Sequence, residues 1–508
     1  MTIAALVTAM LLATAPLPAT PSDAPAGASI ADQFGHVQFA NSGAPAAQRD
    51  FLDGLALLHD FEYDSAAAAF RRAEAADPGF AMAYWGEAMT FNHAVWMEQD
   101  LASARAALAK LGATPADRRA RAKTPREAGY LDALETLYGD GSKVQRDDRY
   151  AAAMLALHAR YPDDVDATAF AALAVLGTAH AGRDYAIYMR AAAMLEAVFP
   201  THQTHPGVVH YLIHSYDDPV HAPLGLRPAR LYGTIAPQAG HALHMTSHIF
   251  VALGMWHETV DANLAAIRVV NEQRQVAGKP PARCGHYSDW LDYAWLQLGD
   301  IAAARAVEAG CRPLALAELA RGAGRPIPSG RSAMVSYYEM VARRGIEFGG
   351  AAPDEAPPLP DGTFLASAFR LVYARAITGP ADPAALSAQA GTLHLLVARI
   401  RDEAAKLPPE EAQSGDADVA RLGIMADQVD ALALLAAGHS EPGFAALKAL
   451  VARESALPAD FGPPEILKPS AELLGDRLAA AGKAAEAVAA YRVALSQAPN
   501  RRLSRAGN

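Results

Sequence analysis

Histidines that could bind a metal ion are concentrated in one part of the chain. Nine of the 17 histidines fall in residues 202–257. Two pairs there have the spacing of one helical turn: His210 and His214 in HYLIHSYDD, and His244 and His248 in HALHMTSHIF. Residues four apart lie on one face of an α-helix, so each pair can offer two imidazoles to a shared ligand. Four neutral imidazoles suit zinc, copper, iron or nickel, and do not suit calcium or magnesium.

The two pairs are related by a fixed step along the chain. His210 and His244 are 34 residues apart, and so are His214 and His248. This step is the length of one helical hairpin in a common class of repeat proteins, in which equivalent positions of adjacent hairpins lie side by side. We therefore expect the four imidazoles to face one groove within reach of one transition metal ion. Two alternatives remain open: a polar groove without a metal, and a structural role in hydrogen bonding.

Other side chains are candidates for the same groove or site. They are His93, Trp96, Asp217, His241, His286, Asp289 and Tyr293. His93 and Trp96 fall in FNHAVW, which we expect to continue a helix. Asp217 could be a ligand, or an acceptor that fixes the tautomer of an imidazole. If the cluster belongs to a metalloenzyme, then Asp217, Asp289 and Tyr293 are candidate proton-transfer groups.

Familiar catalytic motifs are absent from the sequence. His257-Glu258 is not followed by a histidine at HExxH spacing, and neither GxSxG nor GxxxxGK[ST] occurs. Zincin proteases, α/β-hydrolases and P-loop nucleotide hydrolases are therefore disfavoured. Whether the chain is an enzyme stays open.

An internal repeat defines the fold. Two segments share spacings of 12, 4, 3 and 5 between small, aromatic and proline positions: Gly54, Ala66, Phe70, Ala73 and Pro78, and Gly475, Ala487, Tyr491, Ala494 and Pro499. Both resemble the tetratricopeptide repeat (TPR), in which small residues let two helices approach and an aromatic ring fills the gap. Weaker copies surround Gly254, Gly299 and Gly438, and one ends at Pro162. The resemblance implies an all-α, TPR-like superhelix of antiparallel hairpins with a concave groove.

Proline-rich and glycine-rich segments suggest how the chain is divided. Residues 351–362 (AAPDEAPPLPDG) are the strongest candidate boundary, between an N-terminal array over 46–350 that carries the histidines and a C-terminal array over 363–500. The polar tail NRRLSRAGN is expected to be frayed.

The N-terminus has features of an export signal. An apolar run from Ile3 to Ala15 ends in a small-x-small triplet, and a Pro/Ala/Ser-rich linker follows to residue 30. This pattern predicts a periplasmic or secreted protein, although the first basic residue is Arg49. No later stretch has the about 18 uninterrupted apolar residues of a membrane helix. Cys284 and Cys311, at neighbouring ends of one expected hairpin, are predicted to form a disulfide.

Composition narrows the classes of partner. Hydrophobic residues make up 52% of the chain and charged residues 19%, as in a folded protein. A net charge of -11 does not favour nucleic acid as a partner, whereas a protein or peptide is the usual occupant of such a groove.

The histidine-bearing segments resemble one group of repeat proteins. HYLIHSYDDP, ARLYGTIAP and HALHMTSHIF with LGMWHETVDAN are similar to uncharacterised exported bacterial TPR proteins with paired histidines. The matching positions are His93, Trp96, His210, His214, Asp217, His241, His244, His248, His286 and the repeat from Pro469 to Pro499. The resemblance implies a site at these residues without naming a reaction. The leading hypothesis is an exported scaffold that binds a partner and holds a transition metal ion; the alternatives are a metal-dependent enzyme and a metal-free adaptor.

Overall fold

A computed structural model describes residues 30–321, 332–350, 352–406 and 415–507. The predicted signal peptide and nearly all of its linker lie outside the described residues. The N-terminal elements are α1 (Ile30–Phe34), α2 (Pro45–His59), α3 (Tyr63–Ala76), α4 (Ala81–Met89), β1 (Asn92–His93), η1 (Ala94–Trp96), β2 (Glu98–Gln99), α5 (Leu101–Leu111), α6 (Pro115–Arg119), α7 (Pro125–Leu137), α8 (Lys143–Arg160), α9 (Val165–Leu176) and α10 (Tyr185–Val198).

The central and C-terminal elements continue the same helical pattern. They are α11 (Pro206–Tyr216), α12 (Ala222–Ile235), α13 (Gly240–Ala252), α14 (Trp256–Val276), α15 (His286–Leu298), α16 (Ile301–Ala320), α17 (Ala333–Phe348), η2 (Ala352–Asp354), α18 (Leu365–Thr378), α19 (Pro383–Ala404), α21 (Gly415–Ala436), α22 (Ser440–Ser455), α23 (Ser470–Ala480), α24 (Ala484–Gln497) and α25 (Arg502–Gly507).

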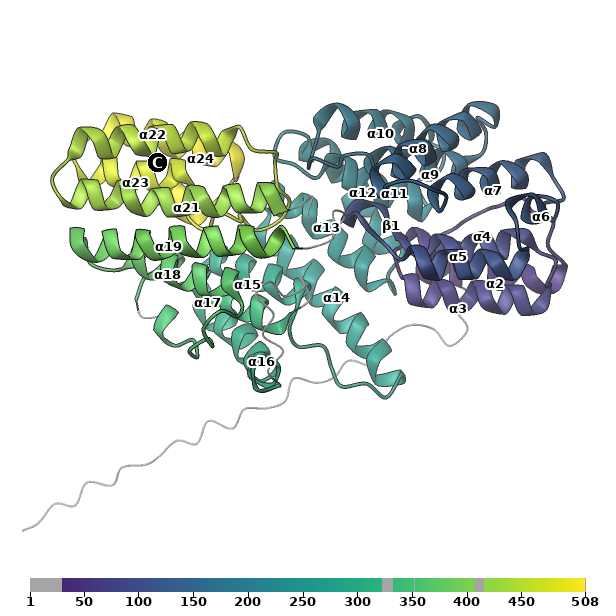
Figure 1. Ribbon diagram of the computed structural model, residues 1–508, viewed down its shortest axis with the longest axis horizontal. Coiled ribbons are helices and arrows are strands. Elements are labelled where there is room, and N and C mark those ends of the chain that lie inside the picture. The colour runs from purple at the N-terminus through teal and green to yellow at the C-terminus, as the bar shows by residue number, and fades with distance from the viewer. Residues whose placement is uncertain (1–29, 322–331, 351, 407–414, 508) are drawn as a thin grey trace, which may run out of the picture.

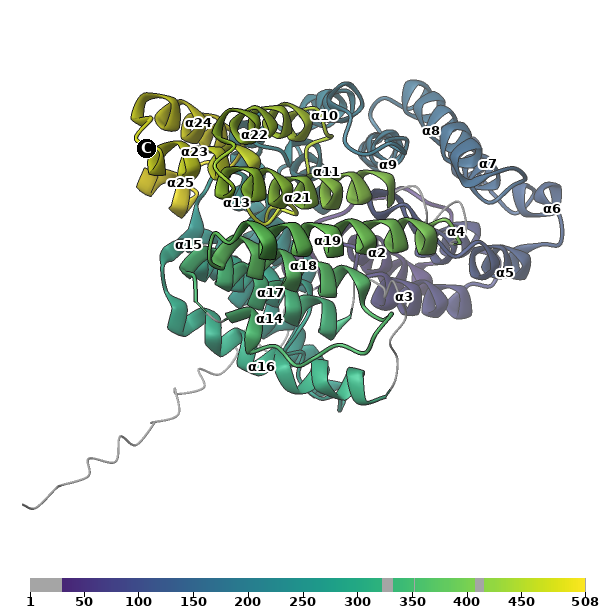
Figure 2. The same cartoon turned by 60° about the vertical axis from the view of Figure 1, so that its left-hand side comes forward.

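The expected all-α, TPR-like fold is confirmed. From α7 to α25, each helix packs against the next one described along the chain, and β1 and β2 form the one sheet within the described residues. In Figure 1 the helices α2–α11 lie to the right and α18–α24 to the left, with α13–α17 between and below them. Figure 2 shows α14, α16 and α17 below α18 and α19.

The two strong repeat segments pack as their residue types predict. A Cβ atom on Gly54 would lie 2.9 Å from the Phe70 ring, and one on Gly475 would lie 2.7 Å from the Tyr491 ring. Only glycine lets the first helix of each hairpin approach the aromatic ring of the second this closely. The turn between α15 and α16 uses another glycine: Gly299 has φ +83°, the left-handed conformation in which helices commonly end.

The buried apolar residues fall mainly into two large clusters. One runs from Phe34 to Ala262 and the other from Ala342 to Tyr491. Ala342 and Ile346 lie in α17, before the proline-rich segment 351–362, so the second core includes residues on both sides of that segment.

The C-terminal tail is docked, and the expectation that it frays is wrong. Arg501 is 1% exposed and forms ion pairs with Glu472 of α23 and Glu347 of α17. Its guanidinium also donates to the hydroxyl of Tyr293 in α15. The indole of Trp256 donates to the carbonyl of Asn500 at 3.0 Å. These contacts fix the C-terminal helices against the histidine-bearing part of the chain.

Among the described residues, no helix combines the length and the apolar composition that spanning a membrane requires.

Candidate metal centre

The histidines lie on the first helices of three adjacent hairpins. α11 packs directly on α13, and α13 is linked through α14 to α15, so that positions one repeat apart come close together. The structure divides the four histidines predicted as one ligand set between two groups. We call His210, His214 and His241 the inner site, and His244, His248 and His286 the outer site. In each site the candidate ligand atoms lie within 4.8 Å of one another.

The division follows from how α11 and α13 are offset. The imidazole of α13 that packs against His210 is His241, with ring centroids 5.1 Å apart, whereas His244 packs against His286 at 4.6 Å. The spacing of residues along a sequence sets which face of a helix they share, but not the crossing and sliding of two packed helices.

The outer site contains two imidazole nitrogens that face each other. His248 Nδ1 donates to Asp217 Oδ2 at 2.6 Å, which leaves Nε2 of that ring to face His244. His244 Nδ1 donates to Asn263 Oδ1 at 2.7 Å, and the amide orientation is fixed because Asn263 Nδ2 donates to the carbonyl of Thr259. The two Nε2 atoms are 3.2 Å apart. This is close to the about 3.3 Å that separates two nitrogens on a tetrahedral ion with metal–nitrogen bonds of about 2.0–2.1 Å.

The inner site contains three imidazole nitrogens without a hydrogen-bond partner. His210 Nδ1 donates to the carbonyl of His59 at 2.6 Å, which leaves the lone pair on Nε2. Nε2 of His210, His214 and His241 is buried in each case and has no partner among the described residues. Buried polar atoms in folded proteins nearly always have a partner, so three in one place require an explanation.

Aromatic rings pack against the histidines of the inner site. Phe61 packs against His210 with the rings tilted and their centroids 4.3 Å apart, and it stacks against His241 at 5.5 Å. Its φ of +59° places a bulky residue in the left-handed region, a strained conformation that often occurs next to functional sites. The ring of Tyr232 also stacks on His210, with centroids 5.1 Å apart.

Burial keeps these imidazoles neutral. Desolvation lowers the pKa of His210, His214, His241 and His244 well below its ordinary value, and the neighbouring histidines lower it further. A neutral imidazole is the form that binds a metal ion. The environment therefore favours the ligand form at neutral pH.

A third group of titratable residues nearby shows what a structural cluster looks like in this chain. His59 contacts Tyr211 through Nδ1 and Asp166 through Nε2, at 2.9 and 3.0 Å. His205 accepts from the backbone of Val208 and contacts the same Asp166 oxygen at 3.3 Å. All four ring nitrogens have partners, which indicates a hydrogen-bonded core and no need for an ion.

The fourth group lies at the surface. His394, Asp427 and Asp430 are exposed or half-buried, and the carboxylate of Asp427 is paired with Arg453. Exposed acidic groups of this kind are usual without a metal ion.

The outer site opens into a cavity. Its volume is about 460 Å³, and its wall includes His286, Trp290 and Phe461. Arg343 is also part of the wall, and its guanidinium donates to Asp289 at 2.7 Å and to Glu339 at 2.6 Å. Burial raises the pKa of Asp289 to about 6, and burial together with Glu339 raises that of Glu465, also in the wall, to about 7. Carboxyl groups that titrate near neutral pH are typical of sites that transfer protons.

The remaining predicted site residues take other places. His93 lies in β1, not in a continued helix, because the chain turns back after α4 and pairs β1 with β2. Its ring nitrogens contact Thr90 and Glu98. Trp96 is 37% exposed and touches His241 edge-on at 5.5 Å, at the rim of the inner site. Tyr293 is buried beside Arg501 and is not among the grouped ligands of either site.

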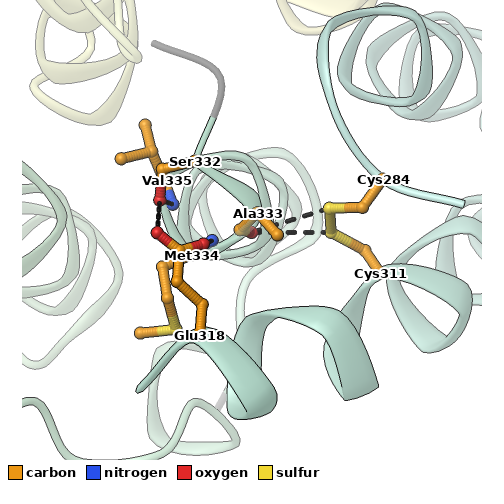
Figure 3. The surroundings of a disulfide bond; sticks show 7 residues. All are labelled: Cys284, Cys311, Glu318, Ser332, Ala333, Met334 and Val335. Carbon is orange, nitrogen blue, oxygen red and sulfur yellow. Dashed lines mark hydrogen bonds between the residues drawn. A yellow bond between two sulfur atoms is a disulfide. The ribbon is translucent and has the colours of Figure 1, made fainter. Parts of the chain in front are cut away.

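A disulfide lies two residues before His286. Cys284 and Cys311 are joined, with Cα atoms 4.5 Å apart, and both sulfurs lie 3.6 Å from the carbonyl of Ala333 (Figure 3). Cys311 lies within α16, which runs on to Ala320, so that helix is longer than the sequence suggested. The bond ties the start of α15 to α16 and thereby restrains His286.

Asn263, and the carbonyl of His59, were not identified from the sequence. Both accept from the first histidine of a pair and fix its tautomer. Asn263 lies in LGMWHETVDAN, but no spacing rule singles it out.

Comparison with known proteins gives no family assignment. No protein-family model and no curated protein matches the chain. Solved structures similar to it include the TPR domain of P58(IPK), at 11% identity over 91% of this chain and 96% of that one, with a TM-score of 0.21. Human IFIT1, solved as a dimer with m7Gppp-AAAA, is 14% identical over 92% of each chain, with a TM-score of 0.30. These scores are low, and the TPR-like fold rests on the helix packing described above.

Proposed function

We propose that this protein is a TPR-like scaffold that binds a transition metal ion at the outer site. The observation that carries the proposal is the pair of Nε2 atoms of His244 and His248, 3.2 Å apart, on rings whose Nδ1 atoms contact Asn263 and Asp217. In the neutral rings these tautomers leave a lone pair on each of the two facing Nε2 atoms. Two lone pairs at this distance repel each other unless a cation lies between them. Protonation is opposed by burial, which holds the pKa of His244 well below its ordinary value. A metal ion removes the conflict.

The ligand set indicates the class of metal. Three imidazoles suit zinc, copper, iron or nickel, and three protein ligands are typical of sites that keep one coordination position open. Asp217 and Asn263 hold two of the imidazoles in the ligand tautomer, which is the usual task of such acceptors.

A metal-dependent enzyme is the second candidate function. The observation that favours it is the cavity beside His286, whose wall carries Asp289 and Glu465 with pKa values of about 6 and about 7. An ion at the outer site would supply Lewis acidity at the edge of this cavity. The carboxyl groups in the cavity wall would accept or donate a proton near neutral pH.

The proposal also covers the partner and the compartment. Concave surfaces of helical-hairpin arrays usually bind polypeptides, so we propose a protein or peptide partner. We further propose export to the periplasm or the cell exterior, which an oxidised Cys284–Cys311 pair would suit. N-terminal sequencing of the mature protein tests export, and a start soon after Ala15 is the expected result.

Metal content tests the metal site. Tag-free protein is reloaded with zinc, copper, iron or nickel and then desalted. We expect the wild type to retain an ion at the outer site and the variant H244A/H248A to lose it. His394→Ala is the matched control, because this histidine also contacts a carboxylate but lies at the surface. Elemental analysis by mass spectrometry gives the stoichiometry, and circular dichroism checks folding. Wild-type protein that retains no ion after reloading would refute the proposed function.

A further inference from the structure

We propose that the inner site binds a second transition metal ion, so that the centre is binuclear. This inference rests on the proposed function and extends it. The ligands are His210, His214 and His241, and the ion is of the same class as at the outer site because the donors are again three imidazoles.

The first observation is the set of unpartnered nitrogens. Nε2 of all three histidines is buried, and within the described residues none has a hydrogen-bond partner. For His210 the tautomer is fixed, because Nδ1 donates to the carbonyl of His59, and its lone pair therefore points at the other two rings. A single ion can bind Nε2 of all three neutral rings, whereas a water molecule has only two hydrogens to donate.

The second observation is that the two sites are copies of one arrangement. Each consists of a histidine pair on one first helix and a third histidine from the first turn of the next first helix. For the inner site these are the α11 pair and His241, and for the outer site the α13 pair and His286. In each pair the first histidine, His210 or His244, donates through Nδ1 to an oxygen, so that Nε2 is the free ligand atom in both.

The two sites are next to each other. His214 and His248 have ring centroids 6.3 Å apart, and His241 and His244 are 6.4 Å apart. Two cations at this separation repel each other, and buried anions nearby reduce the repulsion. Asp217 is 2% exposed and contacts His248, while Glu62 accepts from the backbone of His241 at 3.4 Å. Both carboxyl groups lie among the ligands of the two sites.

Metal stoichiometry in matched variants tests the inference. His241→Ala removes one inner ligand and His286→Ala one outer ligand, and each residue is the least buried of its site. We expect about two ions per chain in the wild type and in the control His394→Ala after reloading with one metal, and about one in each single-site variant. X-ray anomalous scattering from crystals of the loaded wild type should show two peaks, which does not depend on whether a variant folds.

The outcomes separate this inference from the proposed function. If the wild type holds one ion and His241→Ala does not remove it, the outer site is intact and the proposal of a second, inner-site ion is overturned. One ion that both variants lose would indicate a single shared site and also overturn it. No ion at all would refute both proposals.

Discussion

Arg501 provides a test of the architecture that does not depend on any metal ion. Its guanidinium is 1% exposed and lies 2.9 Å from carboxylate oxygens of both Glu472 and Glu347. Arg501→Met keeps most of the side-chain volume and leaves two buried carboxylates without their shared cation. Removing one partner of a buried ion pair costs about 3–5 kcal/mol.

The pKa of Glu472 gives a second figure, for Arg501 acting together with Lys468. Burial by itself raises this pKa, but Arg501 and Lys468 outweigh burial and lower it from the ordinary 4.5 to about 2. A difference of this size corresponds to about 3 kcal/mol, at about 1.4 kcal/mol per pKa unit. Because the pKa is depressed in the folded state, this stability is present above pH 4.5 and is lost as the pH falls towards 2.

Native-state hydrogen exchange measures the effect where it is expected. A loss of about 3 kcal/mol speeds exchange through local opening by about 100-fold, and we expect this for the amides of α23 and α25 in R501M. Arg505→Met is the control, since Arg505 lies in α25, four residues after Arg501, but is exposed. Equal protection of α23 in R501M and R505M would refute the argument that Arg501 holds the C-terminal helices in place.

Three further predictions concern the histidine-bearing hairpins. Thiol titration of denatured, unreduced protein should find no free thiol, and C284S/C311S should destabilise the fold by about 3–4 kcal/mol for a loop of 27 residues; two free thiols would exclude the disulfide. Asn263→Leu should weaken metal binding at the outer site by about 10- to 100-fold while inner-site affinity stays unchanged, measured by chelator competition. The metal-free protein should lose stability as the pH falls below about 6.5, by up to about 1.4 kcal/mol per pH unit for each of the four histidines with lowered pKa, because those histidines take up protons only when unfolded. A thermal midpoint unchanged between pH 7.5 and about 5.5 would contradict this.

The repeat pattern predicted the fold and the faces of the helices, because both depend on local spacing. Gly54 and Phe70 pack as their separation implies, and the step of 34 residues placed α11 beside α13. Each histidine pair does share one helical face. What depends on local geometry was therefore accessible from the sequence.

The composition of each site depends on longer-range geometry and was not accessible in the same way. His241 and His286 complete the two sites from the first turns of α13 and α15, and their reach is set by how those helices slide past their neighbours. The segment 277–284 (AGKPPARC), with Gly278, Pro280 and Pro281, interrupts the 34-residue step and so hid the register of His286. Arg501 was missed for a similar reason: its partners lie 29 and 154 residues away in the sequence, and no periodic pattern relates them.

The contrast between histidine clusters is the strongest argument that the centre binds metal. In the cluster of His59, Asp166 and His205, every ring nitrogen has a partner. In the inner site, three Nε2 atoms have none among the described residues, and each buried unpartnered polar atom costs about 1–3 kcal/mol. Together they approach the whole stability of a typical domain, about 5–15 kcal/mol. Ion binding to the folded state alone offsets such a cost, so the metal-loaded protein should be much more stable than the metal-free form.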